Sequence, residues 1–449
     1  PCPLHPAPCT LHPAPCTLSL MPTFAIYTLG CRLNQADTAL LADALQKHGF
    51  SPLSWGNAAD LLIINSCAVT GVSSRKNRQA VHAARRLAPD AFIVLMGCDA
   101  TAESSYWAEN PDVDLVIPNP KPDSLPDLLP SPLRRNSSPM LVKTPPLPDS
   151  FTVSGTGFYP ERTRANLKIQ EGCDFHCSYC IVPHTRGPAR SRRLDDILRE
   201  AEALLERGHK EIVLSGVNIA TYQDSSYDLP MLVERLLSLD DHFRIRLGST
   251  EPGRCLDRLV AVMAAYPQRI CRFLHLPAQY GEDSILRRMK RHYDCRTYEQ
   301  AVLNAHERIP GLCLGTDIIV GFPGESEENF QACRNFIERI PFGLLHVFPY
   351  SPRPGTPAAS MDERPSSADT RRRSAELREL AAQKYAAFAN SQLGQALPVL
   401  IETLSPSPQG WSDNYLKVRI SSKLPLSANT IVFPTITACK ANRIVHATL

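Results

Sequence analysis

Short apolar runs that alternate with helix-like stretches dominate this sequence and restrict it to α/β folds. Four such runs, with no polar alternation, lie between Thr23 and Pro118. Uninterrupted apolar runs of strand length are typical of parallel strands buried on both faces. They predict a small doubly wound α/β domain over residues 21–118. Its expected strands are Phe24–Leu29, Leu61–Asn65, Phe92–Met96 and Val113–Ile117, and its expected helices are Asp37–Lys47 and Ser73–Leu87.

A second, longer series of the same kind follows a proline-rich stretch. Ten prolines from Pro118 to Pro148 are typical of a linker or an extended surface segment, which we assign to residues 119–160. Six strand–helix units then predict an incomplete (β/α)6 barrel, with its active site at the carboxyl ends of the strands. The expected strands are Ala165–Gln170, Glu211–Val217, Phe243–Ser249, Arg272–Leu276, Leu312–Gly321 and Phe342–Tyr350.

Both ends of the chain differ from these two series. Ala368–Gln392 has the pattern of one charged helix, which completes a barrel unit at residues 161–392. Residues 393–449 contain strand-like runs and almost no helical period, so they predict a small all-β module. Residues 1–20 repeat the sequence LHPAPCT and are rich in proline. We interpret them as disordered or as a misassigned start, because Met21 directly precedes the first strand.

Composition indicates the cellular compartment and the kinds of partner that the chain can have. Apolar residues make up 43% of the 449 residues, but no apolar run is long enough to span a bilayer, so we expect no membrane association. A net charge of +3 does not by itself argue for nucleic acid. Fifteen cysteines in a chain without a secretory signal indicate a reducing compartment, the cytoplasm, where clustered cysteines bind metal more often than they form disulfides.

Three cysteines follow directly after the first strand of the expected barrel. Cys173, Cys177 and Cys180 stand in the spacing C-x3-C-x2-C. Three thiolates so spaced can bind three irons of a four-iron cubane, which leaves the fourth iron open to a chelating substrate. An open position is typical of catalytic rather than structural metal sites. The alternative is a zinc site completed by His176 or His184.

Three further cysteines each follow the end of an expected strand in the N-terminal domain: Cys31, Cys67 and Cys98. Because the carboxyl ends of parallel strands converge along one edge of a doubly wound sheet, these thiols can meet in space. They predict a second metal cluster. The alternative is that they are ordinary buried cysteines, which are common.

The barrel motif resembles that of the radical S-adenosylmethionine (SAM) superfamily, including the aromatic Tyr179 before its last cysteine. The whole stretch from Met21 to Leu449 resembles the methylthiotransferase family. That family combines a three-cysteine domain holding a second [4Fe–4S] cluster, a radical SAM barrel and a small β-barrel called TRAM. The stretches that carry the resemblance are Ile181–Arg192 (IVPHTRGPARSR), Leu214–Asn218 (LSGVN), Thr316–Glu325 (TDIIVGFPGE) and His346–Thr356 (HVFPYSPRPGT).

Within the family, Thr28–Asp37 (TLGCRLNQAD) and His346–Thr356 look most like the MtaB-type branch. The resemblance implies a sulfur-group transferase that adds a methylthio group to carbon 2 of N6-threonylcarbamoyladenosine at tRNA position 37, beside the anticodon. SAM then serves twice, as methyl donor to a sulfur at the auxiliary cluster and as source of the 5′-deoxyadenosyl radical. The rivals are methylthiolation of isopentenyladenosine or of a ribosomal-protein aspartate, and an RNA-binding protein whose clusters are structural or redox-sensing.

The resemblance also suggests contacts for SAM. Ser215, Gly216 and Asn218, at the end of the second barrel strand, are expected against its methionine moiety, and Glu251 against its ribose. Tyr179 of the cluster motif is also expected to contact SAM. An ordinary turn and a solvated glutamate are the alternatives. Asp317 and residues 321–324 close the fifth strand, where shaping of the backbone is as plausible as ligand contact.

The implied partners are the tRNA anticodon stem-loop and an electron donor such as flavodoxin or ferredoxin, and we expect a monomer. Single-stranded RNA loops are bound by aromatic side chains that stack on bases and basic ones that meet phosphates. The candidates for such contacts are Trp411, Tyr415, Lys417 and Arg419 near the C-terminus and Arg186, Arg190, Arg192 and Arg193 after the cluster motif. The alternative is that these side chains belong to the core or to a solvated basic face.

Two departures from the family pattern bear on the site. His275–Glu282 reads HLPAQYGE, so that Tyr280 and Glu282 replace two small hydroxyl residues that we expect near the substrate. After Cys98 the chain has Asp99-Ala-Thr instead of Tyr-Ala-Gln, which we expect to alter the surroundings of the second cluster.

Overall fold

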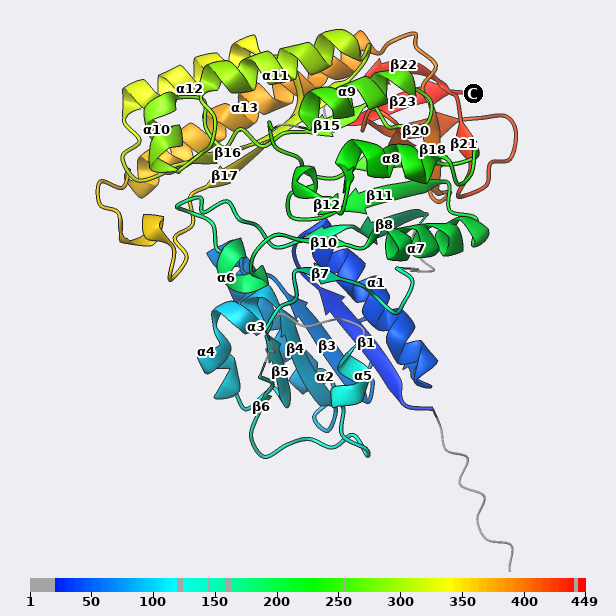
Figure 1. Cartoon of the computed structure of the whole chain (residues 1–449), viewed down its shortest axis with the longest axis vertical. Helices are drawn as coiled ribbons and strands as arrows, with labels where there is room; N and C mark the ends of the chain where they lie inside the picture. Colours follow the sequence, from blue (N-terminus) through cyan, green and yellow to red (C-terminus); the bar gives the residue numbers. More distant parts are fainter. Residues whose placement is uncertain (1–20, 119–123, 144–145, 158–162, 254, 440–442) are drawn as a thin grey trace, which may run out of the picture.

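The computed structural model describes residues 21–118, 124–143, 146–157, 163–253, 255–439 and 443–449. An N-terminal α/β domain lies against one end of a partial barrel, and a C-terminal β module lies beside that barrel (Figure 1). The segment 1–20, which we interpreted as disordered or misassigned, lies outside the described residues. In the part of the chain that is described, no helix combines the length and the apolar character needed to cross a bilayer.

The N-terminal domain is a doubly wound parallel sheet, as the sequence predicts. The strand order is β2-β1-β3-β4-β5-β6, and every pairing is parallel. Alternate residues of β3 pack against α1 on one face and against α2 on the other, which explains its unbroken apolar run. The elements are β1 (Thr23–Thr28), α1 (Arg32–Lys47), β2 (Ser51–Pro52), β3 (Leu61–Ser66), α2 (Gly71–Leu87), β4 (Phe92–Gly97), α3 (Cys98–Ala102), α4 (Ser104–Ala108), β5 (Leu115–Pro118) and β6 (Met140–Leu141).

The proline-rich stretch is more than the linker that we expected. β6 comes from it and adds a parallel strand to the edge of the N-terminal sheet beside β5. A short helix, α5 (Leu125–Leu128), precedes β6, and β7 (Ser150–Phe151) pairs with β10 (Arg190–Arg192) of the barrel unit. The stretch therefore pairs with strands of both domains. Its own strands are too short to produce a hydrophobic periodicity in the sequence.

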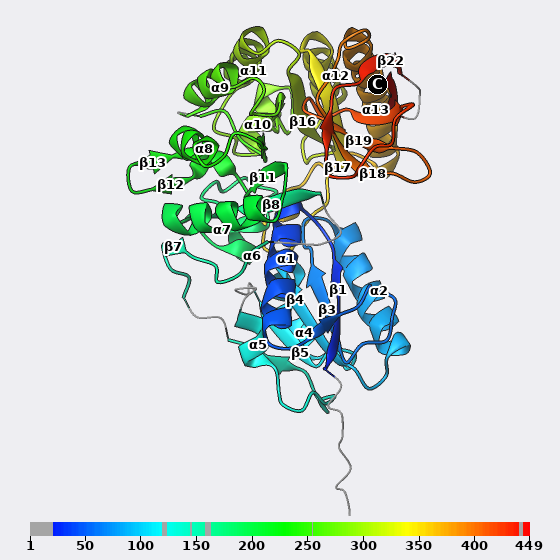
Figure 2. The same ribbon diagram turned by 90° about the vertical axis from the view of Figure 1, so that its right-hand side faces the viewer.

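The central unit is the expected partial barrel of six parallel strands wrapped by helices (Figure 2). Two three-stranded sheets, β14-β11-β8 and β15-β16-β17, are joined by bridges from Ile245 to Ile270 and from Ser249 to His275. The strands are β8 (Arg164–Lys168), β11 (Glu211–Ser215), β14 (Arg244–Leu247), β15 (Phe273–His275), β16 (Cys313–Val320) and β17 (Phe342–Pro349). The helices between them are α6 (Val182–Arg186), α7 (Leu194–Glu206), α8 (Leu229–Leu237), α9 (Leu256–Ala265), α10 (Asp283–Arg288), α11 (Cys295–Arg308) and α12 (Glu327–Arg339), and short strands β9 (Gln170–Glu171), β12 (Gln223–Asp224) and β13 (Tyr227–Asp228) also occur.

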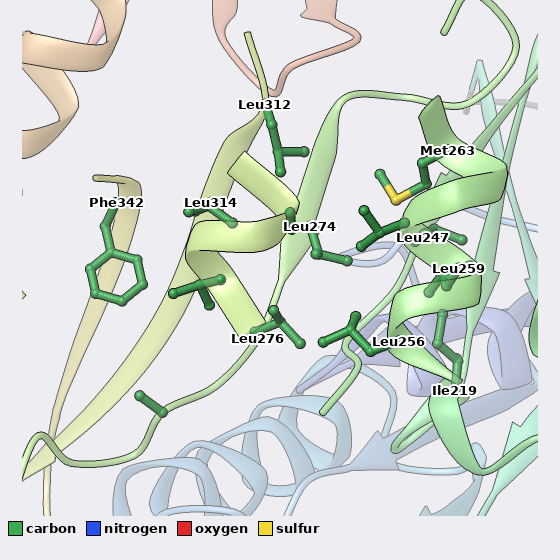
Figure 3. Packing of buried hydrophobic residues seen from close by; sticks show 14 of the residues in the cluster. Ile219, Leu247, Leu256, Leu259, Met263, Leu274, Leu276, Leu312, Leu314 and Phe342 are labelled. Carbon is green, nitrogen blue, oxygen red and sulfur yellow. The ribbon is translucent and has the colours of Figure 1, made fainter. Parts of the chain in front are cut away.

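Aliphatic side chains fix the helices on the outside of the barrel. Leu247 and Leu274, on neighbouring strands, pack with Leu259 and Met263 of α9 (Figure 3). All four are at most 2% exposed. Burying one such side chain contributes about 1.5–3 kcal/mol, so this layer holds the strand ends, and the loops that follow them, in place.

The C-terminal unit is all-β, as expected, and follows the long helix α13 (Ser367–Ser391) that packs along β17. Its sheet has the order β21-β18-β19-β20-β23-β22. The TRAM assignment stays a prediction. The strands are β18 (Val399–Thr403), β19 (Gln409–Ser412), β20 (Lys417–Ser421), β21 (Ile431–Val432), β22 (Thr435–Cys439) and β23 (Ile444–Thr448).

Candidate active site

The loops after the N-terminal strands lie against the loop that carries the barrel cysteines. α3, which begins at Cys98, contacts α6, which follows the C-x3-C-x2-C motif. Ala68, Cys98 and Ile181 form one small buried cluster across this contact. Because Ile181 directly follows Cys180, and Ala68 directly follows Cys67, the two cysteine sets are neighbours in space.

The three N-terminal cysteines come together at the ends of their strands. Gly30, which precedes Cys31, has a φ of +102°, and a Cβ there would lie 2.9 Å from the Sγ of Cys67. Only glycine permits that approach without strain. Burial, together with the neighbouring Cys98 and Cys31, raises the pKa of Cys67 to about 11.

The barrel cysteines occupy an equally tight loop. Gly172 has a φ of +71°, and a Cβ there would lie 1.8 Å from the carbonyl oxygen of Pro188. Burial, together with the neighbouring thiols, raises the pKa of Cys173 to about 11 and that of Cys180 to about 12. Thiolates are the form that binds metal, and they are unfavourable here without added positive charge. Both sets of three crowded thiols therefore fit iron–sulfur clusters, whose irons supply that charge.

A buried arginine connects the barrel cysteines to two of the residues expected to contact SAM. Arg291, only 2% exposed, donates from Nη1 to the Sγ of Cys177 at 3.1 Å and pairs through Nη2 with Glu251 at 2.8 Å. It also reaches the hydroxyl of Tyr179 at 3.4 Å. Sequence reasoning missed Arg291, since it lies more than a hundred residues after the motif and carries no spacing signal.

The LSGVN stretch ends in a buried donor without a partner. The backbone N–H groups of Val217 and Asn218 donate to the Oε1 of Gln170, at 2.9 and 3.0 Å, which fixes the turn after β11. Ser215 ends that strand, and a Cβ on Gly216 would meet the same Gln170 oxygen at 2.9 Å. Among the described residues, no group accepts from the Nδ2 of the buried Asn218. Such an unmade hydrogen bond costs about 1–3 kcal/mol, so this nitrogen fits an acceptor on a ligand such as SAM.

A cavity of about 220 Å³ opens beside the barrel cysteines. Tyr179 and Cys180 form one side, and Asp317 of β16 and Phe348 of β17 form another. Thr70, from the loop that leads from Cys67 into α2, also lines it. The cavity thus touches the loops of both cysteine sets, and its size suits a small planar group.

Comparisons with known proteins agree with this arrangement. The family model described as the Radical SAM superfamily matches residues 167–337, and that described as Uncharacterized protein family UPF0004 matches residues 23–118. The threonylcarbamoyladenosine tRNA methylthiotransferase MtaB of Bacillus subtilis (strain 168) is 32% identical to the chain, over 89% of it and 90% of the relative. The chain belongs to the radical SAM methylthiotransferase family. Such enzymes use SAM and a [4Fe–4S] cluster, and methylthiotransferases carry a second cluster.

Other relatives of this methylthiotransferase carry two different names. The MtaB enzyme of Aquifex aeolicus (strain VF5) is 35% identical, over 84% of the chain and 92% of its own length. The tRNA-2-methylthio-N(6)-dimethylallyladenosine synthase of Anaplasma marginale (strain St. Maries) is 33% identical, over 84% of each chain. Among solved structures, the radical SAM methyltransferase TsrM from Kitasatospora setae shares the fold, with a TM-score of 0.53, 16% identity and coverage of 76% and 77%.

The arginines that follow the cluster motif of this methylthiotransferase form a buried domain interface. Arg186 donates from Nε to the Sγ of Cys98 at 3.2 Å and pairs with Asp37 of α1 and Glu171 of β9. Arg190 also pairs with Glu171. The prediction that Arg186 and Arg190 meet RNA phosphates is therefore wrong, because both guanidinium groups are buried in ion pairs.

Arg192 and Arg193, the next two candidates, differ from each other. Arg192 is fully buried and pairs with Asp196 and Glu200 of α7, so it too is unavailable to phosphate. The side chain of Arg193 is 56% exposed and remains a candidate. Three of these four arginines therefore have a structural role, and Arg193 alone among them remains a candidate for RNA contact.

Replacing Arg186 with methionine should lower the free energy of unfolding by about 3–5 kcal/mol, because Asp37 and Glu171 would lose a buried partner. Urea unfolding of the cluster-free protein measures this change. The matched variant Arg193→Met alters an exposed side chain and should change stability by less than about 0.5 kcal/mol. Equal midpoints for the two variants would contradict the interface role of Arg186.

The C-terminal candidates for RNA contact lie in different settings. Tyr415 stacks on Phe273 of the barrel at 4.2 Å and accepts a hydrogen bond from Arg32, the residue after Cys31, at 2.6 Å. It lines a cavity of about 430 Å³ between the three units. Trp411 packs beside it, with ring centroids 4.8 Å apart. Lys417 is exposed and Arg419 partly buried, so only Lys417 stands fully open to solvent.

The departures from the family pattern do not face the cavity. Tyr280 is 1% exposed and lies in the barrel's hydrophobic core, and Glu282 caps α10 by accepting from the backbone of Ser284 and Ile285. We expected these two residues near the substrate, but neither is among the residues that line the cavity. Asp99 accepts hydrogen bonds from Ser74 and Trp107, so it anchors α2 and α4 around the loop of Cys98.

Proposed function

We propose that this protein adds a methylthio group to carbon 2 of N6-threonylcarbamoyladenosine at position 37 of tRNA. The observation that carries the proposal is the pair of three-thiol sets that meet beside one cavity. The substrate follows from the names of the Bacillus and Aquifex relatives and from the resemblance of Thr28–Asp37 and His346–Thr356 to the MtaB-type branch.

The residues divide into two groups in this proposal. Cys173, Cys177 and Cys180 hold the cluster that, with SAM, supplies the radical that removes hydrogen from carbon 2. The second set, Cys31, Cys67 and Cys98, holds the auxiliary cluster where the methylthio sulfur resides.

Around these cysteines, neighbouring side chains bind and orient SAM. Arg291 fixes Glu251 and Tyr179 next to the barrel cluster, and the Nδ2 of Asn218 is positioned to donate to SAM. Phe348 and Val182 give the cavity an apolar wall that excludes water from the reacting base.

A second candidate substrate is the isopentenyl-type adenosine of tRNA, because the Anaplasma relative is as similar as the MtaB enzymes. Mass spectrometry of tRNA nucleosides from cells with and without the gene separates the candidates. We expect loss of methylthio-threonylcarbamoyladenosine and accumulation of its precursor. Loss of the methylthiolated isopentenyladenosine instead would assign the enzyme to the branch that acts on isopentenyladenosine. No change in either nucleoside would remove tRNA as the substrate and direct attention to a protein or to simple RNA binding.

A further inference from the structure

Three polar side chains from three adjacent barrel strands meet at one point. His275 of β15 and His346 of β17 lie on either side of Asp317 of β16. The Nε2 of His275 is 3.2 Å and the Nδ1 of His346 is 3.1 Å from the same carboxylate oxygen, Oδ1. We call these three residues the polar trio. None of the cluster cysteines belongs to it, and Asp317 is its only member for which the sequence suggested a ligand contact.

The polar trio reaches the cavity beside the barrel cysteines through Asp317. Asp317 lines that cavity together with Tyr179 and Cys180. Most of the remaining lining is apolar: Val69, Ile181, Val182, Ile319, Phe348 and Pro349. The cavity therefore offers apolar walls to a flat base and concentrates its charge at Asp317. A ligand that fits it is an aromatic ring with a polar substituent.

The members of the polar trio have different roles. Burial alone raises the pKa of Asp317, but hydrogen bonds from His275 and His346 outweigh it and hold that pKa below its ordinary value, so the carboxyl is charged. His275 uses both ring nitrogens, one on Asp317 and the other, Nδ1, on the Oγ of Ser249 at 3.1 Å. His275 thus positions Asp317.

His346 is the most exposed member of the trio. Its side chain is 48% exposed. Because its Nδ1 is used on Asp317, its Nε2 is the ring nitrogen left for a ligand. Asp317 thus presents an acceptor to the cavity, and His346, bonded to Asp317, holds an imidazole nitrogen next to that acceptor.

We propose that Asp317 and His346 bind the threonyl group of N6-threonylcarbamoyladenosine and make the enzyme selective for it, an inference that rests on the proposed function. The threonyl group carries a hydroxyl, which Asp317 can accept from. It also carries a carboxylate, to which the Nε2–H of His346 can donate when both ring nitrogens carry hydrogen. The isopentenyl group is a hydrocarbon and would leave both partners unpaired. Sites built to hydrogen-bond a substrate reject the analogue that lacks the polar group by about 10⁴–10⁵-fold.

The test removes the proposed contact once by changing the substrate and once by changing the enzyme. The reconstituted full-length enzyme is assayed on anticodon stem-loop RNA that carries threonylcarbamoyladenosine or its carboxamide, which lacks the negative charge. The kcat/KM of the wild-type enzyme should be about tenfold lower for the carboxamide RNA than for the carboxylate RNA. His346→Phe should raise KM for the carboxylate substrate about tenfold, with little change in kcat, and should no longer distinguish the two RNAs. Asp317→Asn should weaken binding of both RNAs alike.

Several outcomes are distinguishable. The iron content and the far-UV circular dichroism spectrum of both variants should match those of wild type, which reports that they are folded. The matched control His306→Phe changes an exposed histidine of α11 and should leave the discrimination intact. A His346→Phe enzyme that still separates the two RNAs would overturn this inference alone. So would one equivalent of zinc that is bound to wild type and lost in the variant, since the trio would then be a metal site. A wild type active only on isopentenyl RNA would overturn the proposed function itself.

Discussion

Replacing Cys180 with alanine should abolish methylthio transfer and the cleavage of SAM together. Cys180 is one of three thiols in a loop whose fold is fixed by the close approach of Gly172 to Pro188. The remaining two thiols cannot hold three irons of a cubane, so the variant should lose about four irons per chain. Formation of 5′-deoxyadenosine from SAM under reducing conditions should become undetectable.

The control is Cys295→Ala, which removes a partly buried thiol at the start of α11, outside both cysteine sets. This variant should keep its iron and its rate of SAM cleavage. Iron analysis, together with liquid chromatography of the nucleosides formed from SAM, measures both quantities. A Cys180→Ala enzyme that still forms 5′-deoxyadenosine at a rate near wild type would refute the assignment of Cys180 as a cluster ligand.

The strands and the cysteines were predictable because each depends on local pattern. β3 and β4 carry unbroken apolar runs that only a strand buried on both faces explains, and the structure places them as expected. Cys67 and Cys98 directly follow these two strands. Parallel strands bring their carboxyl ends to one edge, so topology alone predicted that these thiols would meet.

The partners of the cysteines were not predictable, because they come from distant segments. Arg291 and Gln170 reach the site through contacts that leave no spacing in the chain. Arg186 was misinterpreted for the same reason. A basic run looks exposed in sequence, and the carboxylates that bury it, Asp37 and Glu171, belong to elements in two different domains.

The polar trio illustrates the same limit. His275, Asp317 and His346 are separated by 42 and 29 residues. For Asp317 the sequence left backbone shaping and ligand contact open, and it indicated neither histidine as its partner. Their meeting depends on the register of β15, β16 and β17, which pairs Asp317 with His346. Strand register in a parallel barrel is set by packing over the whole sheet, so no short stretch of sequence encodes it.

Replacing Cys67 with alanine should separate the two activities that Cys180→Ala removes together. Cys67 lies in the N-terminal domain, whereas the cysteines and candidate SAM contacts of the barrel lie in a unit with its own core. Methylthio-nucleoside should therefore be undetectable, while 5′-deoxyadenosine should form within about twofold of the wild-type rate. The variant should lose about four irons per chain, as Cys180→Ala does, but from the other cluster.

The comparison needs a cysteine variant that leaves both clusters intact. Cys439→Ala, in the C-terminal β module, serves this purpose and should retain all of the iron and both products. Electron paramagnetic resonance of the reduced enzymes, with and without SAM, identifies which cluster remains, because SAM is expected at the open iron of the barrel cluster and should change the signal of that cluster when it is added. If Cys67→Ala also stops SAM cleavage, the shared contact of Ala68, Cys98 and Ile181 must transmit the loss from one loop to the other. Arg186, which joins Cys98 to Glu171 of the barrel, would then be the residue through which the two domains depend on each other.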